Sequence, residues 1–268
     1  MKHFLNKYKC DLCNNNKTDY IYTHKNLKYR QCKNCDLVFQ ERIKDPNIND
    51  QLKIEYNKDY YSKNYTISSQ EKAKRKIQYL QDKKFITKYF KDSVQKKILD
   101  YGFGNEIFIR LFRGKKYGFE FIEKEKYKKD FTFLKNNEIK KKKFDLIIMR
   151  GVVEHLPNFK EILNILTESV TKNGFFFITA TPNTSCLSFR LNNKKFNQNH
   201  PLHLVHFNHI NLANYFLKKN FFNLETTFQY YETPYQNYRK DFKNLKKNKK
   251  THPPAVGNML TMVFKKLV

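Results

Sequence analysis

Lys97-Ile98-Leu99-Asp100-Tyr101-Gly102-Phe103-Gly104 is the stretch of the chain that decides the fold. A short apolar run that ends in an acid and two glycines is typical of the first strand of an open parallel sheet, because the turn after it must let a ligand approach the backbone. A second run, 116–120, also ends in an acid, and residues 107–112 between the two are expected to form a helix. These segments predict a βαβ unit.

Alternation of strands and helices continues on both sides of this unit. Upstream, Ser68-Ser69-Gln70-Glu71 has the form of a capping box and predicts a helix to about Phe90. The apolar residues of this helix fall near helical spacing: Ala73, Ile77, Leu80, and later Phe85, Ile86 and Tyr89. A Lys-rich segment near the end of the chain, 235–254, is expected to be an exposed loop. Downstream we expect strands at 131–134, 144–149, 174–179, 221–225 and 259–264, and helices at about 162–170 and 210–219.

Four of the five cysteines form two knuckles, Cys10-x2-Cys13 and Cys32-x2-Cys35, with eighteen residues between them. This spacing is typical of a closed, structural zinc site with four thiolate ligands. Disulfides are the alternative, but the chain has no apolar leader, and paired knuckles in a reducing compartment indicate metal. Strand-like stretches at 27–30 and 36–39 predict a zinc ribbon. His24 lies between the knuckles and could replace a thiolate, whereas Cys186 stands alone.

The charge of the chain is strongly positive, with 53 Lys and Arg against 25 Asp and Glu, a net +28. Such a balance favours nucleic acid, an anionic membrane face or anionic small molecules as partners. The alternative is a Lys-covered surface that reflects an A/T-rich coding sequence. No apolar run reaches the roughly 20 residues that a membrane span needs, so we expect a cytoplasmic protein without a membrane span.

The acid at the end of the second strand, Glu120, can accept hydrogen bonds from both hydroxyls of a ribose. The turn pattern has Glu106 where a third glycine is usual, and two acids, Asp100 and Glu106, would oppose a pyrophosphate at the start of the helix. A cationic cofactor is therefore the better match.

The predicted strands and the turns after them carry motifs at 98–104, 117–120, 144–147, 153–157, 173–175 and 181–183. Together these motifs resemble the S-adenosylmethionine-dependent methyltransferases of the Rossmann-like class, over residues 70–268. The knuckles resemble the zinc ribbon of a subgroup that includes sugar C-methyltransferases and surface-polysaccharide methyltransferases. The resemblance implies an α/β fold with a mostly parallel seven-stranded sheet, and domains at 1–40 (ribbon), 41–69 (linker) and 70–268 (Rossmann-like domain).

The resemblance also implies site residues. Asp100, Gly102 and Gly104 would line the methionine end of S-adenosylmethionine, and Glu120 would hold its ribose. Glu106 departs from the family pattern and would crowd the cofactor or add a carboxylate near the sulfonium. Only 23 residues separate Glu120 from the strand at 144, so no adenine contact is assigned.

Three residues are candidates for the chemistry of the transfer: His203, His155 and Glu154. Histidine suits proton transfer near neutral pH. We expect His203 to act as the base, because the resemblance places an acting histidine there, and His155 to orient the acceptor. The alternatives are a helix-capping role for His155 and Glu154 and a polar loop for the histidines at 200, 203, 206 and 209.

Two further features bear on the acceptor. Tyr60 and Tyr61 align with a tyrosine that reaches the substrate in the subgroup. The sugar C-methyltransferases carry Tyr-x-Glu-His where this chain has His200-Pro201-Leu202-His203. The loss of Tyr and Glu argues against deprotonation of a carbon beside a ketone and favours O- or N-methylation.

The sequence therefore predicts methyl transfer from S-adenosylmethionine to a small, anionic acceptor such as a nucleotide-linked sugar or another polysaccharide precursor. Two alternatives remain. The first is an RNA methyltransferase that uses the basic surface, which a salt-sensitive RNA affinity would reveal. The second is a degenerate methyltransferase fold that serves as a binding module.

Overall fold

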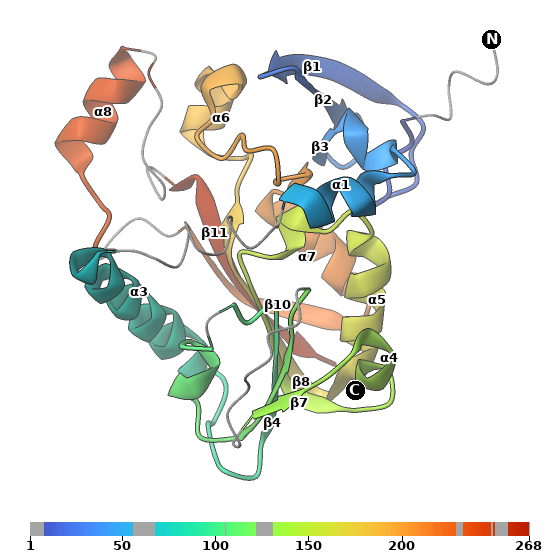
Figure 1. Cartoon of the computed structure of the whole chain (residues 1–268), viewed down its shortest axis with the longest axis vertical. Helices are drawn as coiled ribbons and strands as arrows, with labels where there is room; N and C mark the ends of the chain where they lie inside the picture. Colours follow the sequence, from blue (N-terminus) through green and yellow to red (C-terminus); the bar gives the residue numbers. More distant parts are fainter. Residues whose placement is uncertain are drawn as a thin grey trace.

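A seven-stranded sheet forms the centre of the computed structural model, which describes residues 8–55, 68–104, 106–121, 131–228, 233–247, 249 and 257–267 (Figure 1). The strand order is β10-β11-β8-β7-β4-β5-β6. β11 is antiparallel to both of its neighbours, and the other adjacent strands are parallel. The mostly parallel seven-stranded sheet is confirmed. Its strands are β4 (Lys97–Tyr101), β5 (Lys115–Phe119), β6 (Phe131–Phe133), β7 (Phe144–Arg150), β8 (Val170–Pro182), β10 (Phe221–Thr227) and β11 (Met259–Lys266).

Helices cover both faces of the sheet, with α3 on one side and α4, α5 and α7 on the other (Figure 1). The central strands are buried on both faces, so their sequences are continuous apolar runs. Successive residues alternate between two buried clusters: Ile148 packs on the α3 side, and Ile147 and Met149 pack on the α5 side. The helices are α1 (Ile48–Glu55), α3 (Ser69–Thr87), α4 (Asn136–Ile139), α5 (Phe159–Ser169), α6 (Leu187–Leu191), α7 (His209–Leu217) and α8 (Tyr238–Lys246), and the 3-10 turns are η1 (Glu41–Lys44), η2 (Ile109–Leu111), η3 (Val153–His155) and η4 (Asn193–Lys195).

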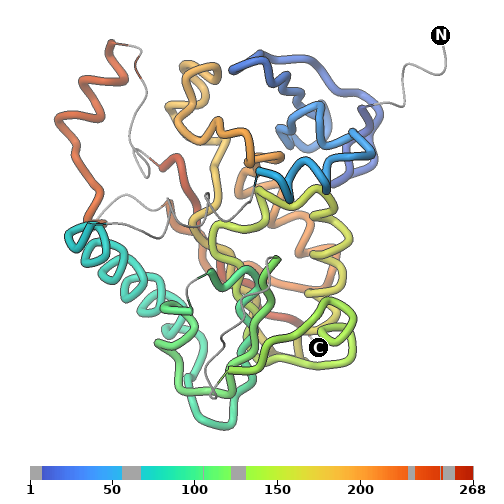
Figure 2. The backbone as a smooth tube through the Cα atoms, viewed as in Figure 1, coloured from blue at the N-terminus to red at the C-terminus, as the bar shows by residue number. Residues whose placement is uncertain are grey.

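A second, antiparallel sheet carries the N-terminal segment and has the order β1-β2-β3-β9. Its strands are β1 (Thr18–His24), β2 (Leu27–Cys32), β3 (Val38–Gln40) and β9 (Val205–His206). β9 comes from far along the chain, and Figure 2 shows the blue N-terminal segment beside the orange segment that contains it. Cys10, Cys32 and Phe39 belong to the same buried cluster as Leu99 and Phe207. The N-terminal segment therefore shares its core with the large sheet.

Helix α3 begins at the predicted capping box, where the Ser68 side chain accepts a hydrogen bond from the Glu71 N–H at 3.2 Å. Near the end of the helix the predicted apolar spacing agrees with the structure, because Ile86 is completely buried. In the first half of the helix it does not. Ile77 and Leu80 are 48% and 47% exposed, whereas Tyr79 and Asp82 are buried. The apolar spacing was misleading because this helix faces a polar site at the end of β7.

Two other expectations differ from the structure. The segment 107–112 forms only the short turn η2, because 13 residues join β4 to β5 and leave little length for a helix. Part of the segment expected as a loop, 235–254, forms α8, which begins where the Asn237 side chain accepts from the Lys240 N–H at 3.1 Å. Tyr60 and Tyr61 lie outside the described residues. Within the described ranges, no helix has the length and apolar character that a bilayer span requires.

Candidate functional site

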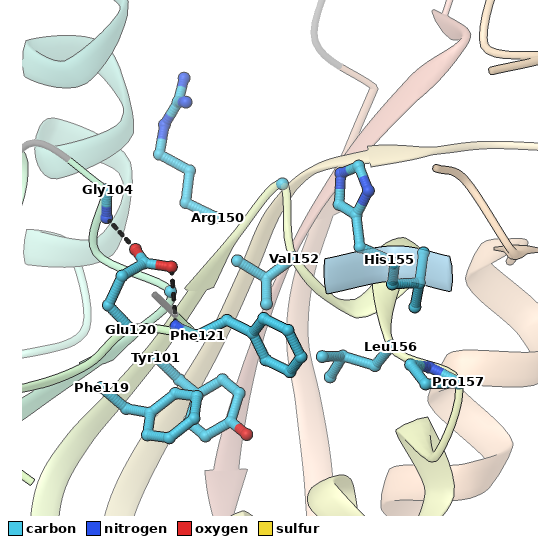
Figure 3. Close-up of a pocket in the computed structure, with 13 residues that line it drawn as sticks. Tyr101, Gly104, Phe119, Glu120, Phe121, Arg150, Val152, His155, Leu156 and Pro157 are labelled. Atoms are coloured by element: carbon cyan, nitrogen blue, oxygen red, sulfur yellow. Dashed lines mark hydrogen bonds between the residues drawn. The ribbon is translucent and has the colours of Figure 1, made fainter. Parts of the chain in front are cut away.

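A cavity of about 180 Å³ opens at the carboxyl ends of β4, β5 and β7 (Figure 3). Ligands of open parallel sheets bind at this edge. A second hollow of about 460 Å³ shares Phe119, Glu120 and Phe121 with the first. Glu120 therefore lies on the wall common to both. The cavity is lined by Leu52, Tyr101, Gly102, Gly104, Phe119, Glu120, Phe121, Arg150, Gly151, Val152, His155, Leu156 and Pro157.

The glycine turn after β4 has the backbone that the sequence pattern predicts. Gly102 has φ +82° and Gly104 has φ +59°, a region that favours glycine. A Cβ atom on Gly102 would also lie 2.5 Å from Cγ2 of Val152. Any larger residue at 102 would thus push Val152 out of the cavity wall.

The Glu120 carboxylate is tied to this turn. It accepts hydrogen bonds from the backbone N–H of Gly104 at 2.8 Å and from that of Phe121 at 2.9 Å (Figure 3). Glu120 also lines the cavity, and each oxygen of a carboxylate can accept more than one hydrogen bond. The geometry can present a carboxylate to a diol.

Asp100 is buried at the end of β4 and is not one of the lining residues. Its Oδ1 atom has no hydrogen-bond partner among the residues that the structure describes. Burial, with a smaller contribution from the nearby Glu120 charge, raises the pKa of Asp100 to about 8. The acid is thus held close to neutral behind the turn.

Glu106 has φ +63°, so it keeps the left-handed backbone of the glycine that it replaces. Its carboxylate accepts from Arg110 Nε at 3.0 Å and forms an ion pair with the same guanidinium. The side chain is therefore turned toward its own segment, and it is not one of the residues that line the cavity.

Arg150 is a lining residue that the sequence patterns did not predict. It is the one Lys or Arg among the described lining residues. Its Nε donates to Asp82 Oδ2 at 2.9 Å, and its guanidinium lies 4.5 Å from the centre of the Tyr79 ring. The sequence feature that could have predicted this role is the position of the arginine, at the end of an apolar strand and directly before Gly151. The site thus has one fixed cation that faces an otherwise acidic and apolar cavity.

The structure brings the three predicted catalytic residues together. The rings of His155 and His203 are 4.6 Å apart, although 47 positions separate them in the chain, and His155 Nε2 is 4.0 Å from Glu154 Oε1. His155 Nδ1 is hydrogen-bonded to the carbonyl of Leu202 at 2.9 Å, and His203 Nδ1 to that of Gln198 at 2.8 Å. Two separate segments therefore converge on one point beside the cavity.

Burial sets the protonation of this cluster. Desolvation lowers the pKa of His155 to about 4 and that of His203 well below its ordinary value, and it raises the pKa of Glu154 to about 8. These shifts favour the uncharged form of both imidazoles at neutral pH, and they make each ring a weaker base than an exposed histidine.

The other histidines of the loop have different surroundings. His206 is buried in β9 of the small sheet and stacks on Tyr29, with ring centres 5.7 Å apart. His200 Nδ1 accepts from the Leu202 N–H at 3.1 Å, and His209 begins α7. The surroundings of His206 indicate a packing role.

The four knuckle cysteines form one cluster, with all four sulfur atoms within 4.8 Å of one another. The Sγ atoms of Cys10 and Cys35 are 3.6 Å apart, and those of Cys13 and Cys32 are 3.5 Å apart. Zn–S bonds of about 2.3 Å in a tetrahedron place sulfur atoms about 3.8 Å apart, so the cluster fits zinc. His24 instead bonds to the carbonyl of Lys194 at 2.9 Å.

Comparison with known proteins identifies the class. Residues 69–225 match the family model described as a methyltransferase domain, and the chain belongs to that family. Its fold is that of the S-adenosylmethionine-dependent methyltransferases, and it is an enzyme of this kind. No curated protein sequence matches the chain.

Two solved structures share the fold. One is 1,6-didemethyltoxoflavin-N1-methyltransferase from Burkholderia thailandensis, with bound 1,6-didemethyltoxoflavin and S-adenosylhomocysteine (TM-score 0.54, 12% identity, 93% of this chain and 100% of that chain covered). The other comes from a complex of the Haloferax volcanii Trm112 methyltransferase activator with a methyltransferase (TM-score 0.51, 9% identity, 73% and 97% covered).

Proposed function

We propose that the enzyme methylates an oxygen or nitrogen atom of a small, anionic acceptor, such as a nucleotide-linked sugar or another polysaccharide precursor. The observation that carries this proposal is the convergence of His155 and His203, with ring centres 4.6 Å apart, beside a cavity that His155 also lines. An oxygen or nitrogen acceptor commonly has a proton to lose, and an uncharged histidine is suited to take it.

The cofactor side supplies binding and orientation. S-adenosylmethionine, when bound, supplies an electrophilic methyl group on a sulfonium. Glu120 would accept hydrogen bonds from its ribose hydroxyls, and the turn from Asp100 through Gly102 to Gly104 would let its methionine end approach the backbone. Arg150, held by Asp82, would pair with the methionine carboxylate. These residues align the donor, which is a large part of catalysis of an in-line transfer.

The acceptor side handles the proton. His203 would remove it from the acceptor atom, and His155 would orient the acceptor through its position on the cavity wall. Glu154 lies beside both and accepts a hydrogen bond from Thr181 at 3.3 Å, so it would fix the environment of the two rings.

The four knuckle cysteines would hold one structural zinc ion. The fit of their sulfur positions supports a closed tetrahedral site, which leaves no ligand position for the acceptor. The predicted divisions of the chain at 1–40, 41–69 and 70–268 belong to the same proposal.

The preference for an anionic acceptor rests on the net charge of +28. A positive field raises the local concentration of phosphate-bearing molecules. The same charge, with the cysteine cluster, favours RNA as the second candidate acceptor.

Release of S-adenosylhomocysteine from S-adenosylmethionine is the assay that tests the acceptor. We expect nucleoside-diphosphate sugars to stimulate release, and the same sugars without the nucleotide and bulk transfer RNA to have little effect. Stimulation by RNA alone, together with RNA binding that weakens steeply between about 50 and 200 mM salt, would replace the first candidate with the second.

A further inference from the structure

Gln40, the last residue of β3, lies between the cysteine cluster and the histidine loop (residues 200–204). It is completely buried. Its side-chain Nε2 lies 3.0 Å from the carbonyl oxygen of His200, 3.2 Å from that of Pro201 and 2.9 Å from that of His203. Its backbone N–H donates to the carbonyl of Leu204 at 2.8 Å. The Tyr29 hydroxyl is a fourth acceptor within reach, 3.1 Å from the same atom. The two N–H groups of the amide are thus shared among these acceptors, three of which belong to the turn that carries His203.

The orientation of the Gln40 amide is fixed by its neighbour. Arg42 Nε donates to Gln40 Oε1 at 2.7 Å, which turns the NH₂ group toward the loop. Arg42 also donates to the carbonyl of Pro201 and forms an ion pair with Glu55 at 2.7 Å. The amide NH₂ group therefore faces the carbonyl groups of the histidine loop and the hydroxyl of Tyr29.

The cysteine cluster holds the other end of this connection. The Cys32 N–H donates to the carbonyl of Leu37 at 3.0 Å, so the second knuckle leads directly into β3. β3 pairs with β9, where Val38 lies opposite His206. In addition, Asn211 of α7 donates to the carbonyl of Cys35 at 3.2 Å. The knuckle, β3 and the histidine loop form one continuous hydrogen-bonded path.

We propose that Gln40 is the positioning residue of His203 and that metal binding by the four cysteines, through β3, controls the geometry of the acceptor side of the site. This inference rests on the proposed function for the catalytic meaning of His203, but the mechanical connection does not. Without metal, four thiols that share a space of a few ångströms would separate. β3 would lose its support at the knuckle and keep its pairing with β2 and β9, so the Gln40 amide would be held less firmly against the loop.

Hydrogen exchange measured by mass spectrometry tests the connection without any acceptor. In Gln40→Met, which keeps the volume and removes the donor, we expect the amides of residues 203–206 to exchange roughly tenfold faster or more, while zinc content and protection of β4 and β7 stay unchanged. Gln31→Met is the matched control, because Gln31 lies on the neighbouring strand and its side chain donates to Asp36, away from the loop. In that variant the loop should exchange within about twofold of wild type.

A second measurement covers the case in which Gln40→Met does not fold. Removal of zinc from the wild-type chain by a chelator should speed exchange in the same loop and should raise the rate at which diethyl pyrocarbonate modifies His203. Unchanged loop exchange in the zinc-free chain overturns the proposal. An equal loss of protection in β4 and β7 also overturns it, because zinc removal would then loosen the whole fold and not the histidine loop in particular.

A failure of the proposed function is detected by a different measurement, the release of S-adenosylhomocysteine. If His203→Ala releases S-adenosylhomocysteine at the wild-type rate with a nucleoside-diphosphate sugar, the base assignment falls, yet the exchange result for Gln40 still decides the positioning claim.

Discussion

The two sides of the candidate site differ in how far apart their residues lie in the sequence. The cofactor side, Gly102, Gly104 and Glu120, spans 18 positions and is held by a backbone turn and a bond from Gly104 to Glu120. The acceptor side joins His155 to His203 across 48 positions, and its loop is bound by Gln40, 163 positions before His203. Local geometry therefore forms the first side, whereas the second depends on contacts between distant segments. Damage to the N-terminal segment should consequently affect the two sides unequally.

The largest effect is expected from Cys32→Ser. Loss of one of four ligands should release about one zinc per chain, and structural zinc sites contribute on the order of 10 kcal/mol to folding of small metal domains. Because Cys32 shares a buried cluster with the large sheet, the melting temperature should fall as well. Metal analysis and thermal unfolding measure both. Cys186→Ser is the control, since Cys186 caps α6 and is not part of the cluster, and it should retain the metal. Full zinc content in Cys32→Ser would contradict the ribbon.

His203→Ala tests the acceptor side directly. Loss of a general base should reduce kcat about 10²–10⁴-fold and leave the cofactor Kd nearly unchanged. His155→Ala should mainly raise the acceptor KM. Steady-state kinetics and calorimetry with S-adenosylhomocysteine separate these effects, with His209→Ala as the control. Wild-type turnover in His203→Ala would remove it from the mechanism.

Glu120→Ala tests the cofactor side. The loss of hydrogen bonds to a charged group should weaken S-adenosylhomocysteine binding by roughly 1.5–3 kcal/mol, with a smaller effect on the chemical step. Glu106→Ala is the matched control, because that carboxylate pairs with Arg110 and does not line the cavity. An unchanged Kd in Glu120→Ala, measured by calorimetry, would show that this acid does not contact the cofactor.

Arg150 sharpens the comparison, because it belongs to the cofactor side but depends on a distant helix. The double variant Arg150→Met, Asp82→Asn removes the cation without leaving a buried charge unpaired. We expect S-adenosylhomocysteine to bind about tenfold more weakly, while methylthioadenosine, which lacks the carboxylate, binds as before. Equal losses for both ligands would argue that Arg150 acts only through folding.

The smallest effect concerns pH and Glu154. Its pKa in the folded chain is about 8, against 4.5 for the ordinary group, because burial penalises the charged form. The folded state then holds a proton that the unfolded state releases, so this group makes stability fall as pH rises from about 4.5 to 8. The free energy of unfolding of Glu154→Gln, relative to that of the wild type, should therefore rise by on the order of 1 kcal/mol per pH unit across that window. Urea unfolding at about pH 5, 6.5 and 8 measures this difference. If the free energies of unfolding of the two proteins differ by the same amount at all three pH values, the pKa of Glu154 lies near its ordinary value.

Patterns within single segments of the sequence determined much of this protein. The knuckle spacing predicted the cysteine cluster, because a pair of thiolates two residues apart turns toward one point. The pattern from Asp100 to Gly104 predicted the turn after β4, because φ at 102 and 104 is positive and favours glycine. The Ser68 capping box predicted the start of α3. In each case the information lies in neighbouring residues.

Tertiary structure alone decided the rest. The guanidinium of Arg150 is held at the cavity by Asp82 and Tyr79 of α3. These two residues are buried, whereas Ile77 and Leu80, which the apolar spacing predicted to be buried, are exposed. The meeting of His155 with His203 depends on where the ends of β7 and the loop before β9 fall relative to each other. Gln40 carried no visible signal, because a glutamine is meaningful only through the carbonyl groups that surround it. Hydrogen bonds between segments depend on register and on packing, and neither is written in the local sequence.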